Sequence, residues 1–190
     1  MPEKLNEVLE FLLTRRSRPA KTLKEPIPSR EDIRQILTAA SRSPDHGKLE
    51  PWRFIVLSEP SLRKLSRDVL EHAKRLGLDK EKTLKARKQY DDGKLAIAVI
   101  EVQKKSEKIP MIEQTYSAGA VCLALLNAAL ASGWGANWLT GWPVHDRKFV
   151  SDSLGLSNNE RVAGMIYIGT ETLIPPERPR PELNEKITWR

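Results

Sequence analysis

The chain has 190 residues, of which 39% are hydrophobic, and a formal net charge of +7 from 32 basic and 25 acidic side chains. This length fits one domain with a substantial core. A single cysteine, Cys122, excludes a disulfide within the chain and favours a reducing cytoplasm. The start of the chain is acidic and amphipathic, unlike a signal peptide. The basic residues are scattered among the acids, apart from one cluster near residue 15, so most of the charge is interpreted as solvated surface.

The N-terminal part predicts helices on either side of a strand. Five aliphatic residues at helical spacing predict a first helix with one buried face, stopped by Pro19: Leu5, Val8, Leu9, Leu12 and Leu13. Ser29 followed by Asp32 resembles a capping box for a second helix that ends near residues 42–44. We then expect a strand over 52–57 and a helix over 61–76 that closes at Gly77. The charged residues 79–92 are interpreted as a solvated helix or a lid.

The most apolar stretch of the chain covers residues 116–142. Almost every residue from Ala118 to Ala131 is small or aliphatic, which predicts a helix buried on all sides within about 112–132. Only about fourteen residues lie between Ser117 and Ser132, whereas a membrane-spanning helix needs about twenty. The helix is therefore expected at the centre of a domain and not in a membrane.

The remaining patterns complete one α+β domain over residues 1–190. Strands are predicted over 95–102, 136–139 and 162–169. Asp146 is placed to cap a short helix through Leu154, with Gly155 as its stop. From residue 173 the prolines predict a stiff, extended tail. Helices come first and are followed by mixed strands and helices, which is typical of the α+β class.

Few residues suggest chemistry by themselves. The run Arg15-Arg16-Ser17-Arg18 offers guanidinium groups and a hydroxyl suited to a phosphate monoester, although a solvated helix end is the alternative interpretation. His46 lies in a turn, where a histidine is more often a surface residue than a ligand. His72 and His145 are remote from it, so no metal site is predicted. No nucleotide-binding glycine fingerprint and no nucleophile elbow is found.

Four blocks in one order change this interpretation: RRSR at 15–18, RSPDHGKLEPWRF at 42–54, SAGAVCLALLNAALASGWGANWLTG at 117–141 and GMIYIGT at 164–170. Together, from Leu9 to about Thr170, they resemble the flavin-dependent nitroreductase family, especially its short bacterial single-domain branch. The resemblance implies a central mixed or antiparallel β-sheet flanked by helices, with a buried central helix. It also implies an intertwined homodimer with FMN at the subunit interface and no nucleic-acid or membrane partner.

The resemblance also implies roles for particular residues. Eight would hold FMN, with His46 supplied by the partner subunit: Arg15, Arg16, Ser17, Arg42, His46, Trp138, Leu139 and Thr140. Six at the end of the central helix would face NADH or NADPH: Ala128, Ala129, Leu130, Ala131, Ser132 and Gly133. Residues 173–190 would wrap the partner. No side chain is implied to be catalytic, because flavin N5 takes the hydride from the nucleotide and passes it to a nitroaromatic or quinone in a ping-pong cycle.

Two other functions stay open at this point. A flavin enzyme of the same fold can dehydrogenate or fragment its substrate instead. A basic nucleic-acid-binding protein would use Arg15 to Arg18, and its affinity would depend strongly on salt.

Overall fold

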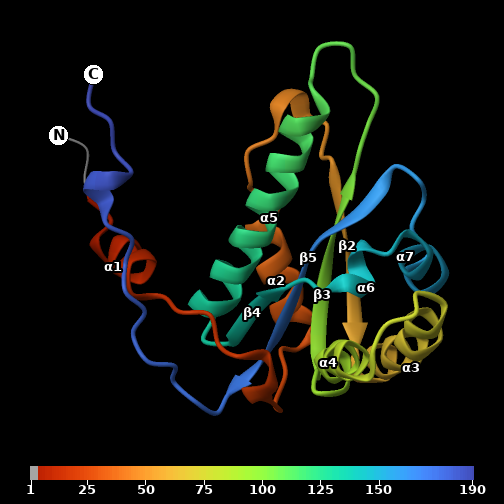
Figure 1. Cartoon of the computed structure of the whole chain (residues 1–190). Helices are drawn as coiled ribbons and strands as arrows, with labels where there is room; N and C mark the ends of the chain where they lie inside the picture. The colour runs from red at the N-terminus through yellow and green to blue at the C-terminus, as the bar shows by residue number, and fades with distance from the viewer. Residues whose placement is uncertain (1–3) are drawn as a thin grey trace.

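The computed structural model describes residues 4–190 and places an antiparallel sheet between two layers of helices (Figure 1). The strands follow the order β1-β5-β3-β2, and β4 also pairs with β5. Every pair is antiparallel. The strands are β1 Leu23–Lys24, β2 Trp52–Ser58, β3 Leu95–Val102, β4 Gly135–Leu139 and β5 Glu160–Glu171. The predicted α+β class and central sheet are confirmed, and of these strands only the two-residue β1 was not expected.

The helices of residues 4–190 are α1 Asn6–Thr14, α2 Arg30–Ala40, α3 Glu59–Arg75, α4 Lys80–Asp91, α5 Met111–Ala131, α6 Trp142–His145 and α7 Arg147–Leu154. Among them, α2 and α7 begin at the caps that the sequence predicts, whereas the short α6 was not expected. The Ser29 hydroxyl accepts a hydrogen bond from the backbone N–H of Asp32 at 3.1 Å, which confirms the capping box of α2. The Asp146 carboxylate caps α7, and Gly155 ends it at a φ of 68°.

Strand β3 is buried on both faces and separates two cores. Its residues 96, 98 and 100 face α3, α4, α6 and α7, and its residues 95, 97 and 99 face α2 and α5. The alternation follows from the period of two along a strand. A strand covered on both sides has no polar face, which explains its continuous apolar run.

Helix α5 is buried on one side only, which corrects the prediction that it is buried on all sides. Val121 and Leu125 are fully buried, whereas Ile112, Tyr116 and Leu123 are 52%, 68% and 46% exposed. The exposed residues are spaced four and seven apart, so they form one apolar stripe along the helix. By length and composition α5 is able to cross a membrane, but 44% of its apolar window is buried inside the chain. An apolar pattern on every face of a helix predicts that each face is buried. It does not predict that residues of the same chain bury all of them.

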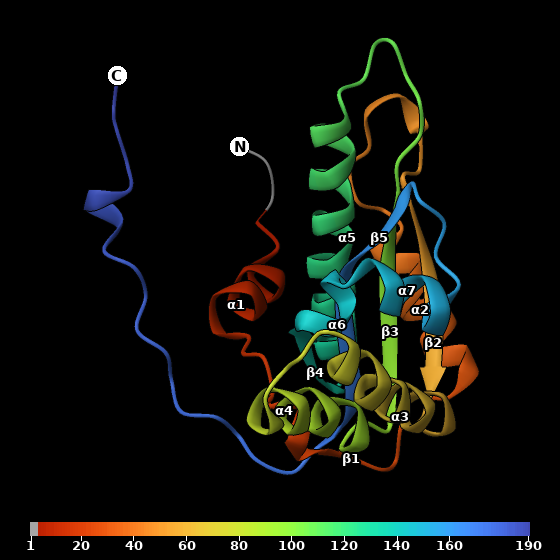
Figure 2. The ribbon, with the colours of Figure 1, turned by 45° about the vertical axis from the view of Figure 1, so that its right-hand side comes forward.

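Helix α1 also departs from expectation. The predicted helix is present, but none of its residues is buried. The aliphatic side chains of its apolar face are each more than half exposed: Leu5, Val8, Leu9, Leu12 and Leu13. Helix α1 and the C-terminal tail stand away from the sheet and its helices in both views (Figures 1 and 2). Within residues 4–190, the apolar face of α1 is therefore left uncovered.

Two further segments differ in how they relate to the core. Helix α4 covers the charged residues 79–92, but its Ala86 and Tyr90 are buried, and the Tyr90 ring lies 6.2 Å from that of Phe149. It is therefore part of the core and not a fully solvated helix or a free lid. The tail has no regular structure from residue 173 to 182, as its prolines predict, and then forms one helical turn at Leu183–Glu185.

Candidate functional site

The chain leaves α1 through a basic segment that lines a cavity of about 400 Å³. Arg15, Arg16 and Ser17 belong to this wall, and Arg15 Nη2 donates a hydrogen bond to Ser17 Oγ at 3.1 Å. Arg178 and Arg180 of the C-terminal tail line the same cavity. Two segments from opposite ends of the sequence therefore bring four guanidinium groups and a hydroxyl together.

The tail is held against the end of α1 by hydrogen bonds from these arginines. The guanidinium of Arg16 donates to the carbonyl oxygen of Pro176, and that of Arg180 donates to the carbonyl oxygen of Leu13. The carboxylate of Glu177 pairs with both Arg16 and Arg180. The position of the tail therefore depends on the same residues that line the cavity.

Positive charge is concentrated around Arg15. Burial lowers the pKa of Arg15 first, and the nearby charges of Arg16 and Arg18 lower it further. Its Nε is buried and has no hydrogen-bond partner within residues 4–190. Arg18 is neutralised by an ion pair with Glu171, and among residues 4–190 no carboxylate pairs with Arg15. A buried donor without an acceptor and an excess of guanidinium groups fit a phosphate monoester.

A second cavity of about 290 Å³ adjoins the first and shares Arg15 and Arg16. Leu130, Gly133 and Trp134 line it from the end of α5 and the residues after it. Leu130 and Gly133, two of the residues predicted to face a nucleotide, thus line a cavity together with the basic segment. The other residues of that stretch differ in position, because Ala129 is fully buried in the core, Ala128 is half-buried, and Ala131 and Ser132 are exposed.

Strand β4 is tied to the basic segment by two hydrogen bonds. Arg18 N donates to Ala136 O at 2.8 Å, and Asn137 Nδ2 donates to Arg18 O at 2.6 Å. The next residue, Trp138, lies over Gly164 of β5 so closely that a Cβ there would collide with the indole nitrogen. The partly exposed Trp138 ring therefore packs on β5 at Gly164, at the end of β4 away from Gly135.

The other two residues predicted in this region point to different places. The Leu139 side chain packs against the core that includes α3 and α4. Only the backbone of Leu139 is therefore available to a ligand on the other side of β4. Thr140 is exposed and lines a cavity of about 270 Å³ together with Gln89 and Trp142.

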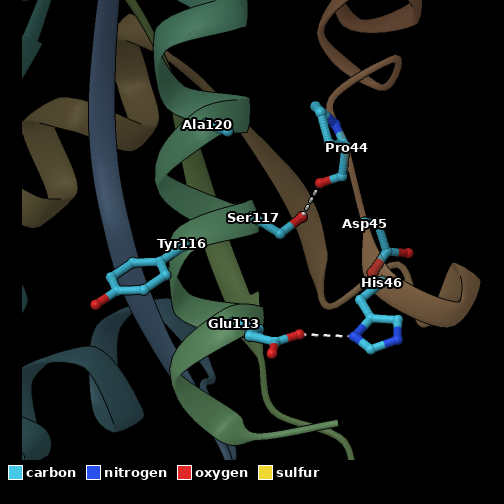
Figure 3. A pocket seen from close by; sticks show the side chains of 7 residues that line it. All are labelled: Pro44, Asp45, His46, Glu113, Tyr116, Ser117 and Ala120. Carbon is cyan, nitrogen blue, oxygen red and sulfur yellow. Dashed lines mark hydrogen bonds and ion pairs between the residues drawn. The ribbon is translucent and has the colours of Figure 1, made fainter. Parts of the chain in front are cut away.

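The turn that contains His46 lies against the N-terminal half of α5 (Figure 3). His46 Nδ1 is 2.7 Å from Glu113 Oε2, and Ser117 Oγ donates to Pro44 O at 2.8 Å. These residues line a cavity of about 300 Å³ beside the exposed Tyr116. Arg42, two residues before Pro44, is exposed.

The backbone of this turn adopts an unusual conformation. Gly47, Lys48 and Glu50 all have positive φ angles, of 70°, 53° and 46°. Two of the three are not glycine, which strains the backbone. The conformation is held because the Asp45 carboxylate accepts a hydrogen bond from Glu50 N at 2.6 Å, and because Gly47 lies directly against Ile109.

A single chain does not bring all the predicted site residues together. Ser117 of α5 contacts the His46 turn, whereas Leu130, near the other end of α5, lines the second cavity together with Arg15. At about 1.5 Å per residue, these two positions lie roughly 20 Å apart along the helix. Arg15, Arg16 and Ser17 therefore lie close to β4, and Arg42 and His46 lie at the far end of α5.

Several residues of these cavities were not predicted as site residues, and they include the charged groups of Arg178, Arg180 and Glu113. Arg178 and Arg180 belong to the Arg-Pro-Arg-Pro run. The prolines of this run predicted a stiff tail, and its two positive charges could also have indicated a phosphate-binding segment. Glu113 had no local signal, because its contact with His46 joins residues 67 positions apart. Within residues 4–190, the His, Cys, Asp and Glu side chains form no group that could hold a metal ion.

The fold and these cavities define an α+β protein with a basic cavity suited to a phosphate-bearing ligand. A sequence model described as "Nitroreductase family" matches residues 12–170. Over 167 residues the chain is 33% identical to "Putative NAD(P)H nitroreductase YdjA" of Escherichia coli strain K12, and the match covers 88% of this chain and 90% of that protein. The chain therefore belongs to the nitroreductase family.

Solved structures support the same fold. The nitroreductase-like family protein from Bacillus cereus superposes with a TM-score of 0.80 at 19% identity, covering 100% of this chain and 99% of that chain. A protein from Desulfovibrio desulfuricans solved in complex with FMN has a TM-score of 0.76 at 21% identity, with 100% and 98% coverage. At this identity the similarity establishes the fold and leaves the site to be argued from this chain's residues.

Proposed function

We propose that this chain is an FMN-dependent oxidoreductase that uses NADH or NADPH as electron donor. The observation that carries the proposal is the cavity lined by Arg15, Arg16, Ser17, Arg178 and Arg180, in which the half-buried Arg15 has a buried Nε without a partner among residues 4–190. Membership of the nitroreductase family and the name of the Escherichia coli relative support it. When bound, FMN takes a hydride from the nicotinamide and transfers electrons to an acceptor, while the protein binds and orients both.

The residues of this chain fit such a cofactor in two places. Arg15, Arg16 and Ser17 would hold the phosphate and the adjoining chain, and Arg178 and Arg180 would add further donors from the tail. The flavin ring would lie along β4, against the exposed side of Trp138, the backbone of Leu139, and Thr140. Leu130 and Gly133, in the adjoining cavity, would face the nicotinamide nucleotide.

The functional unit in this proposal is a homodimer. The uncovered apolar faces of α1 and α5 support it, because exposed apolar surface of this extent commonly marks an interface. A two-fold related partner would also bring its Arg42 and His46, which lie at the far end of α5, to the Arg15 cavity of the first subunit. The tail from residue 173 would wrap the partner.

The proposed reaction is a ping-pong cycle. The oxidised nucleotide leaves before a nitroaromatic, a quinone or a similar acceptor enters the same cleft. The lone Cys122, fully buried in α5, is consistent with a reducing cytoplasm.

A visible absorption spectrum tests this proposal directly. The purified protein is incubated with FMN, desalted, and mixed without oxygen first with NADH and then with NADPH. We expect the flavin bands to elute with the protein and to bleach when the preferred nucleotide is added. Flavin that stays bound but is reduced by neither nucleotide would favour a flavin enzyme with a different reaction. A colourless protein would refute FMN binding.

A further inference from the structure

The contact between His46 and Glu113 has no evident role in stability. Their side chains are 60% and 43% exposed, although Nδ1 and Oε2 are only 2.7 Å apart. Exposed ion pairs of this kind contribute little to folding, because solvent screens them and two side chains must be immobilised. An ordered pair in the wall of a cavity therefore calls for another explanation.

The backbone around both His46 and Glu113 is held in place by other hydrogen bonds. Glu113 lies in the first turn of α5, and its neighbour Gln114 is buried and bridges the backbone N–H and C=O of Lys104 at 2.8 and 2.9 Å. His46 is held by the positive-φ turn and by the hydrogen bond from Ser117 to Pro44. Contacts other than the pair itself therefore hold the turn against α5 and bring the two side chains together.

The pair determines which nitrogen of His46 is available. An ionised carboxylate only accepts hydrogen bonds, so His46 Nδ1 carries the hydrogen that points at Glu113. The other ring nitrogen, Nε2, lies on the side of the ring away from Glu113 (Figure 3). Among residues 4–190 it has no hydrogen-bond partner, so a ligand can donate a hydrogen bond to it when the ring is neutral or accept one from it when the ring is protonated. A carboxylate behind a histidine fixes both tautomer and orientation in this way at many functional sites.

We propose that Glu113 is a positioning residue, which fixes the Nδ1–H tautomer and the ring orientation of His46 so that Nε2 is presented to the flavin site. The inference rests on the proposed function, in which His46 of one subunit reaches the FMN held by the other. It adds a residue from the start of α5, which the predicted set of site residues did not include.

The tautomer is measured on FMN-free protein by long-range ¹H–¹⁵N correlation of the histidine rings at about pH 8.5, where an ordinary imidazole is neutral. The chain has three histidines, so His46→Gln identifies the signal of His46 by its loss. We expect the Nδ1–H form in the wild type, its loss in Glu113→Ala, and its recovery in Glu113→Gln, whose amide oxygen still accepts. Glu107→Ala, in the exposed loop before α5, is the matched control and leaves the tautomer unchanged. Identical His46 spectra in the wild type and in Glu113→Ala would overturn the proposal.

Titration with FMN then separates this proposal from the function on which it rests. We expect the Nε2 signal of the wild type to shift when FMN binds, and Glu113→Ala to weaken FMN binding about tenfold, as is typical when the outer partner of a functional histidine is removed. Glu107→Ala binds FMN as the wild type does. If the wild type binds no FMN, the proposed function fails, while the tautomer result still stands. If FMN binds with no shift of His46 and with equal affinity in Glu113→Ala, the role of Glu113 is refuted and the proposed function remains.

Discussion

Arg15 is the residue on which the candidate site depends most. A helix-terminal arginine in water interacts favourably with the helix dipole and needs no ligand. Arg15 differs, because burial and the neighbouring Arg16 and Arg18 lower its pKa and its Nε has no acceptor among residues 4–190. A guanidinium in that position is stabilised when an anion binds beside it.

The basic segment predicts a clear loss of cofactor on mutation. Replacing Arg16 and Ser17 together by Ala removes two hydrogen-bonding groups next to the expected phosphate. At about 1.5 kcal/mol or more for each charge-assisted bond, we expect the Kd for FMN to rise at least about 100-fold. Fluorescence titration of FMN measures it. Arg63→Ala in α3, which removes an exposed arginine paired with Glu59, is the control. Unchanged affinity in the double variant would refute the assignment.

At the scale of elements, α1 and α5 share one property. Each has an apolar face at helical spacing, and neither face is covered by this chain. Burial of apolar surface contributes about 25 cal/mol per Å², so two such helices provide a strong driving force for association. The stripe on α5 begins at the cavity that His46 and Tyr116 line and runs toward the cavity that Leu130 and Arg15 line. A partner that packs on α5 therefore lies next to both cavities.

A charge placed on this stripe is expected to break the dimer. Leu123→Glu introduces a carboxylate that a helix-to-helix contact would have to bury without a partner, and we expect the dimer dissociation constant to rise at least about tenfold. Gel filtration with light scattering measures the mass of the protein in solution. We expect FMN occupancy to fall as the dimer dissociates. Leu70→Glu in α3 is matched, since the two leucines are 45% and 46% exposed. Equal masses for both variants would contradict an interface on α5.

At the scale of the whole molecule, a buried charged network ties α5 to the sheet. The Glu101 carboxylate of β3, 2% exposed, accepts hydrogen bonds from Arg161 of β5, Thr115 of α5 and Gln103. Burial acts to raise the pKa of Glu101, but these hydrogen bonds outweigh burial and leave the pKa below its ordinary value. Removing one partner of such a network leaves a buried charge with fewer bonds.

This network predicts how stability changes in acid. Because the pKa of Glu101 is lower in the folded chain, its stabilisation is fully present above the unfolded value of about 4.5 and is lost as the pH falls through the folded value. Glu101→Gln is expected to lower the free energy of unfolding at pH 7 by about 1–3 kcal/mol. It is also expected to flatten the loss of stability below pH 4.5. Urea unfolding between pH 7 and 3 measures both, with Glu107→Gln as control. A pH dependence equal to that of the wild type would contradict this role.

Features that depend on neighbours within four residues could be predicted before the structure was known. The capping box at Ser29 and Asp32, the cap at Asp146 and the stop at Gly155 all formed as expected, since a helix end is decided by its own first and last turns. Strand β3 was predicted from the continuous apolar run over residues 95–102, which is also a local pattern. The burial of Tyr90 in α4 was not predicted, because the charged residues around it describe only the solvated side of that helix.

The sequence by itself determined most of the helices and strands, their approximate boundaries and the residue types that could bind a phosphate or a flavin, but not β1 or α6. Tertiary structure decided which of these residues meet. Arg180 reaches Leu13 across 167 positions, and Glu113 reaches His46 across 67. It also showed that α1 and half of α5 are left uncovered by their own chain. Hydrophobicity indicates how much surface must be buried, but the partner that buries it depends on packing over distances that local sequence patterns do not encode.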